Sequence, residues 1–151
     1  MEKYEAIAAL IAENTDIVDF ADFEDGVSDF WINKAQDHLK VAFPPSYIWW
    51  LRNYGGGEIL GDEIYSVYQK DFGTFIGGDI VYINELDREN GLVDNKRLVI
   101  QRNDQGETYY FDLLQADEYG EYPVFRYIND TAVKYADDFL DFLAKRIKDE
   151  H

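Results

Sequence analysis

Apolar residues recur at helical spacing in two N-terminal segments, which predicts two amphipathic helices. Residues 2–14 carry the first apolar stripe, without Gly or Pro. The second stripe runs from Ser28, a good N-cap residue, to about Val41. The acidic segment 16–26 lies between these stripes and predicts a loop.

Two prolines separate the second helix from a third. Pro44 ends the second helix because the residue before a proline is pushed out of the helical region. Pro45 suits the first turn of the next helix, where a missing N–H group costs nothing. This helix is expected to end at glycines 55–57, since glycine adopts the left-handed conformation without a Cβ penalty.

The pattern then changes to short apolar runs, which predict strands. The expected strands are 58–60, 63–69, 97–102, 107–113 and 124–128. Residues 103–106 form a turn that joins two of them as a hairpin. A helix is expected over 80–89, and an apolar stripe predicts a terminal helix over 139–147. We therefore expect an α+β fold in one domain over 1–151, with N-terminal helices and a C-terminal helix packed on an antiparallel sheet.

The charge of the chain narrows the choice of partner. Its 151 residues include 14 Lys and Arg against 31 Asp and Glu, which gives a net charge of −17. Such a surface repels nucleic acid and anionic membranes, so neither is an expected ligand. A basic protein is the complementary partner. The alternative interpretation, that the charge only keeps the protein soluble, stays open at this point.

The supply of catalytic residues is poor. The chain has no cysteine, which fits a cytoplasmic protein and excludes thiolate chemistry. Its histidines are His38, on the expected solvent side of a helix, and His151, the last residue printed, so a serine triad is not expected. The spacing around Gly26 fails the pattern of a calcium loop. We expect no metal, no cofactor and no enzymatic activity, although a carboxylate-dependent hydrolase remains an alternative because 31 acids allow many pairs.

Four segments in order resemble one known family. Residues 39–56, LKVAFPPSYIWWLRNYGG, resemble the LPxxYxxFLxxxNGG signature of the SUKH superfamily, the Smi/Knr-like proteins. Residues 97–112 are similar to the family's hairpin, which closes with GxxxxxD. Residues 123–127, PVFRY, and 136–143, ADDFLDFL, resemble its PVxxx strand and its terminal helix. The residues that carry this pattern and are expected to shape the fold are Pro45, Tyr47, Gly55, Gly56 and Asp112.

The resemblance implies a non-catalytic α+β protein that serves as a bacterial immunity protein. Such a protein neutralises a cognate polymorphic toxin, often a nuclease, and other relatives act as regulatory scaffolds. Together with the charge, the resemblance favours binding to a basic toxin surface, and it leaves the oligomeric state open. The carboxylates expected to contact the partner are Asp22, Glu24, Asp25, Asp62, Glu63, Asp117, Glu118 and Glu121.

Overall fold

A seven-stranded antiparallel sheet organises the part of the chain that the computed structural model describes, residues 2–20, 26–68, 79–91 and 94–149. The strands are β1 Val18–Phe20, β2 Gly57–Ile59, β3 Asp62–Ile64, β4 Arg97–Arg102, β5 Thr108–Asp112, β6 Val124–Ile128 and β7 Thr131–Ala136. They lie side by side in chain order from β1 to β7. The helices among the described residues are α1 Glu2–Glu13, α2 Asp29–Leu39, α3 Pro45–Tyr54, α4 Ile80–Glu89 and α5 Phe139–Ile147. The expected α+β class is confirmed.

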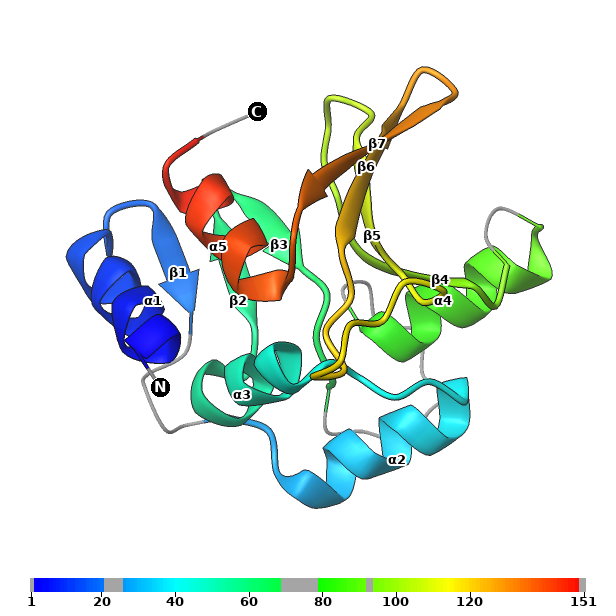
Figure 1. Cartoon of the computed structure of the whole chain (residues 1–151), viewed down its shortest axis with the longest axis horizontal. Coiled ribbons are helices and arrows are strands. Elements are labelled where there is room, and N and C mark those ends of the chain that lie inside the picture. Colours follow the sequence, from blue (N-terminus) through cyan, green and yellow to red (C-terminus); the bar gives the residue numbers. More distant parts are fainter. Residues whose placement is uncertain (1, 21–25, 69–78, 92–93, 150–151) are drawn as a thin grey trace.

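The helices form two groups around the sheet (Figure 1). α5 packs against β7, and α1 and α3 both contact α5. On the other side of the view, α4 contacts β4, and α2 lies beside α4 and α3. The first turns of α1, α3 and α5 lie around one cleft, although these helices belong to the beginning, the middle and the end of the chain.

α3 is the helix at the centre of the hydrophobic core. Pro45 occupies its first turn, as expected, and Gly55 ends it in the left-handed conformation with a φ of 75°. Tyr47 and Trp50 are fully buried. The Tyr47 ring contacts four other aromatic rings, and its hydroxyl donates a hydrogen bond of 2.6 Å to the backbone oxygen of Tyr65. These contacts tie α3 to both α5 and the sheet.

A side chain takes the place of a strand beside β4. Asn84 of α4 donates to the backbone oxygen of Val99 at 2.9 Å and accepts from its N–H at 2.8 Å. A neighbouring strand would satisfy the same two groups. The short strand β3 does not extend along this part of β4. The completely buried amide of Asn84 satisfies the backbone N–H and oxygen of Val99 instead, so neither group is left without a hydrogen bond.

The prediction of a loop over 16–26 is wrong in part, because β1 forms within it. Val18 of β1 is buried and pairs with Ile59 of β2. The two strands approach closely at Gly57, where a Cβ atom would lie 2.2 Å from the backbone oxygen of Asp19. A three-residue strand is too short to show a period of two, so the surrounding acids dominate the local pattern.

Two further strand assignments need correction. The strand expected over 63–69 is β3, which ends at Ile64, and residue 69 lies outside the described ranges. β7 is not predicted by the sequence pattern, because its first four residues are all exposed and show no alternation. The turn before it, Asn129 and Asp130, has φ angles of 52° and 61°, which suits a tight hairpin turn between twisted strands.

The buried hydroxyl of Tyr47 yields a stability prediction. Tyr47→Phe leaves the carbonyl of Tyr65 without this donor, so the free energy of unfolding is expected to fall by about 2 kcal/mol. The control Tyr119→Phe alters an exposed ring and is expected to change it by less than about 0.5 kcal/mol. Urea denaturation followed by circular dichroism measures both. Equal stability of Tyr47→Phe and the wild type would contradict a structural role for this bond.

Candidate functional site

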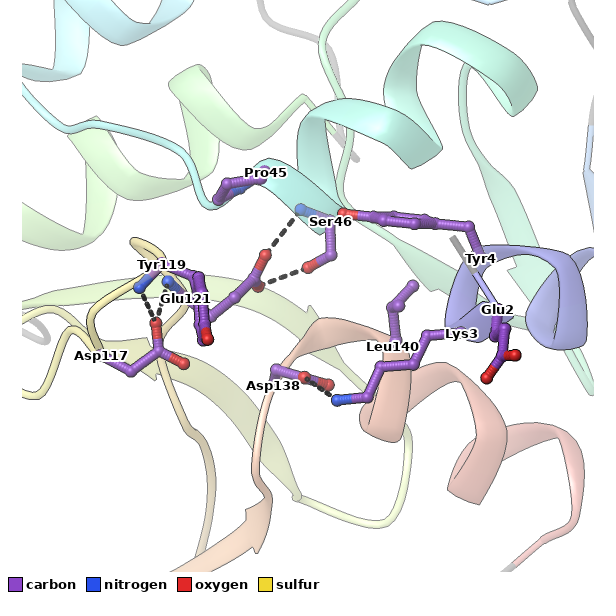
Figure 2. Close-up of a pocket in the computed structure, with 10 residues that line it drawn as sticks. All are labelled: Glu2, Lys3, Tyr4, Pro45, Ser46, Asp117, Tyr119, Glu121, Asp138 and Leu140. Carbon is purple, nitrogen blue, oxygen red and sulfur yellow. Dashed lines mark hydrogen bonds and ion pairs between the residues drawn. The ribbon is translucent and has the colours of Figure 1, made fainter.

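A cleft of about 620 Å3 opens where the first turns of α1, α3 and α5 meet the segment after β5 (Figure 2). We call it the acidic cleft. Its lining residues are Glu2, Lys3, Tyr4, Pro45, Ser46, Asp117, Tyr119, Glu121, Asp138 and Leu140. Figure 2 shows the Glu121 side chain reaching toward the start of α3, and Asp138 beside the start of α5.

One wall of the acidic cleft is formed by residues 113–122, here called the 113–122 loop. The Asp112 carboxylate before it accepts hydrogen bonds from the N–H of Leu114 at 3.0 Å and from Nε2 of Gln115 at 2.6 Å. The Asp117 carboxylate accepts from the N–H groups of Tyr119 and Glu121 at 2.8 and 3.0 Å. These bonds close the backbone into tight turns, as Asp side chains commonly do in turns.

Glu121 fixes the end of this loop to α3. Its Oε2 accepts from the Ser46 N–H at 2.9 Å, and its Oε1 accepts from the Ser46 hydroxyl at 2.5 Å. The N–H groups of a first helical turn have no partner within the helix, and the helix dipole favours a negative charge there. Burial raises the pKa of Glu121, while the two bonds from Ser46 act to lower it. The carboxylate is therefore a structural helix cap with both oxygens engaged.

A second carboxylate caps α5 at the opposite wall. Asp138 is the N-cap residue, and its Oδ1 accepts from the N–H of Asp141 at 2.8 Å. Its Oδ2 lies 3.7 Å from Nζ of Lys3. Among the lining residues, four carry carboxylates and only Lys3 carries a positive charge. The acidic cleft is thus a site of negative potential, and a cationic group is its complementary ligand.

Asp117 and Glu121 are the residues of the expected partner set that line the acidic cleft. Glu118 is exposed on the same loop but does not line the cleft. Asp22, Glu24 and Asp25 lie outside the described residues. A partner-binding role for the set stays a prediction.

Asp62 and Glu63 belong to a different part of the structure. Asp62 pairs with Arg146 at 3.1 Å, and Glu63 accepts a hydrogen bond of 2.6 Å from the hydroxyl of Tyr68. Arg146 lies in the last turn of α5, whereas Asp138 precedes its first turn. Eight residues of helix separate these two ends by about 12 Å. Among the described residues of the predicted set, the structure therefore separates Asp62 and Glu63 from the acids of the 113–122 loop.

The arrangement offers little for catalysis. The Ser46 hydroxyl is buried and donates to Glu121, whereas His38 pairs with Glu85 at 2.9 Å on the surface, so no serine–histidine pair forms between them. Within the described ranges, no group of three or more His, Asp or Glu side chains could hold a metal ion. What the acidic cleft can do is bind a cation or a cationic side chain.

A family comparison relates this chain to known proteins. The family model SUKH_6, described as SMI1-KNR4 cell-wall, matches residues 29–143, more than half of the chain. The chain belongs to this SUKH family. The family resemblance of the sequence motifs is therefore confirmed, and membership is consistent with an immunity-type function and with a protein partner. No helix in the described ranges combines the length and apolar character needed to cross a bilayer.

The region matched by the SUKH model covers only part of the acidic cleft. The matched region includes α3, the 113–122 loop and the first residues of α5, but α1 precedes it. Glu2, Lys3 and Tyr4 were not expected at a site, because an acidic first helical turn is common for reasons of helix stability. Tyr119 was also missed, although it lies between two expected contacts, Glu118 and Glu121.

The contacts of Glu121 predict unequal roles for two glutamates of one loop. Glu121→Ala removes the acceptor at the start of α3, so the free energy of unfolding is expected to fall by about 1–2 kcal/mol. Glu118→Ala changes an exposed side chain and is expected to alter it by less than about 0.5 kcal/mol. Urea denaturation of the two variants and the wild type measures the difference. Equal losses would rule out the capping role.

The environment of Asp62 predicts a larger loss. Asp62→Ala leaves the Arg146 guanidinium, which is 4% exposed, without its carboxylate, so we expect a loss of about 3 kcal/mol. Asp29→Ala, the control, removes an exposed pair with Arg52 and is expected to cost at most about 1 kcal/mol. Thermal and urea denaturation compare the two variants. If Asp62→Ala is as stable as Asp29→Ala, the buried pair does not join α5 to β3.

Proposed function

We propose that this protein is a cytoplasmic immunity protein that binds a cognate toxin with a basic surface and blocks the active site of that toxin. The class of toxin that we propose is a nuclease. The observation that carries the proposal is the acidic cleft, in which four carboxylates meet one ammonium group. Membership of the SUKH family and the net charge of −17 support the same partner class.

The proposed mechanism is occlusion without reaction. A nuclease presents cationic groups to bind phosphates, and a rigid surface of carboxylates competes for these groups but contains no bond that the enzyme can cleave. Electrostatic potentials of opposite sign on the two proteins raise the rate at which they associate. Well-packed contacts at the centre of the interface slow dissociation. The helix caps formed by Glu121 and Asp138 hold the wall of the acidic cleft in place before the partner arrives.

A regulatory scaffold is the second candidate. The description of the matching family model, SMI1-KNR4 cell-wall, favours it. A scaffold binds several partners with modest affinity, whereas an immunity protein binds one toxin tightly. The number of partners and their affinities therefore separate the two functions.

Co-expression with a toxin tests the proposal. The candidate toxin to be tested is the C-terminal domain of a polymorphic toxin encoded by a neighbouring open reading frame. Induced alone, it is expected to stop growth, and co-expression of this protein is expected to restore it. The purified protein is expected to abolish the toxin's activity at one molar equivalent. Continued toxicity together with no detectable complex overturns the proposal.

Association rates test the electrostatic part of the mechanism. Raising the salt concentration from 20 to 500 mM is expected to slow association with the toxin domain by about tenfold or more, since exposed charges are screened. Stopped-flow fluorescence measures the rate. An association rate that does not change with salt contradicts electrostatic steering, even where growth is restored.

A further inference from the structure

Two large apolar side chains stand out of the 113–122 loop. Leu114 is 70% exposed and Tyr119 is 74% exposed, the highest values for large apolar residues in the described ranges. Both belong to a loop of ten residues beside the acidic cleft, and Tyr119 also lines the cleft. The fold does not bury these side chains, so they are available to pack against another molecule.

The loop holds these side chains on a fixed backbone. Besides the bonds to Asp112 and Asp117, the N–H of Asp117 donates to the backbone oxygen of Glu121 at 2.8 Å. Glu121 joins the loop to α3, and the hydroxyl of Tyr122 donates to the backbone oxygen of Ala42 at 3.0 Å. A loop ordered in advance loses little conformational entropy when it binds, which improves affinity without new contacts.

Charge identifies the kind of partner that the loop fits. Residues 103–125 contain six Asp and Glu but no Lys or Arg. The exposed residues Asp117 and Glu118 directly precede Tyr119 on the loop itself. A tyrosine ring beside carboxylates suits a Lys or Arg side chain. The ring packs against the aliphatic stem or the cationic group of that side chain, and the carboxylates neutralise the positive charge.

We propose that the 113–122 loop is the docking element for a basic protein. In the complex, Leu114 and Tyr119 become buried, and a Lys or Arg side chain of the partner enters the acidic cleft beside Tyr119. Tyr119 is the principal binding residue because aromatic side chains with rigid support dominate interface energies. This inference rests on the proposed function and names the surface that performs it.

Alanine substitutions with a matched control test the proposal. The probe is the same candidate toxin domain, purified in a catalytically inactivated form. Tyr119→Ala is expected to raise the Kd about 30-fold or more and Leu114→Ala about tenfold, mainly through faster dissociation. Phe30→Ala, which alters a residue of α2 that is 66% exposed, is expected to leave the Kd within about twofold. Surface plasmon resonance gives both rate constants, and melting curves confirm that each variant is folded.

A pair of charge reversals tests the role of the loop's acids. Glu118→Lys and Glu89→Lys change the net charge equally, but Glu89 is an exposed residue at the end of α4. Glu118→Lys is expected to slow association at least fivefold more than Glu89→Lys at low salt, because repulsion acts most strongly near the contact. Equal slowing overturns docking through this loop.

The outcomes separate this inference from the proposed function. If the wild type binds tightly and Tyr119→Ala binds as well as Phe30→Ala, the toxin docks on another surface, and the immunity function stands without the loop. If the wild type does not bind the toxin domain at all, the proposed function fails and the docking site fails with it. Loss of binding confined to Tyr119→Ala and Leu114→Ala supports both.

Discussion

The burial of Tyr47 is the contact on which the arrangement of the helices depends. Its ring lies 5.2 Å from those of Phe43 and Phe139 and 5.9 Å from those of Trp50 and Phe111, measured between centroids. These rings belong to the segment before α3, to α3 itself, to β5 and to α5, so one side chain holds three elements together. Aromatic rings are rigid and each buries a large area, so these contacts fix the position of α3 relative to β5 and α5. The start of α3 is thereby placed at the acidic cleft.

The acidic character of the cleft is compatible with stability because helix ends compensate for it. Glu121 and Asp138 each accept bonds from the N–H groups of a first helical turn, where the helix dipole favours negative charge. Burial nevertheless raises the pKa of Glu121, and repulsion from Asp138 and Asp117 adds to this effect. Four of the lining residues of the cleft are acidic and one is basic, so in our proposal its negative potential attracts a cationic partner. The same carboxylates thus serve folding and, in our proposal, recognition.

Patterns over neighbouring residues predicted much of this fold but not all of it. The helix at 80–89 and the hairpin at 97–113 follow from spacing and turn residues, and both are present. β1 and β7 were not predicted because a three-residue strand and an exposed edge strand depend on a neighbouring strand rather than on their own period. The acids near residues 117–121 were expected at a binding surface, but their separation from Asp62 and Glu63 depends on how α5 crosses the sheet.

The sequence by itself determined the α+β class, the family, the strong negative charge, the lack of cysteine and the small number of histidines. These properties are sums over the chain or patterns between close neighbours, so they can be determined without a three-dimensional structure. Only the tertiary structure decided which carboxylates cap helices, which one pairs with Arg146, and that Tyr119 stands beside a cleft. Each of these depends on segments that are distant in sequence, since α1, α3 and α5 meet only after the core has packed. Distances between such segments are set by packing, and no local pattern records them.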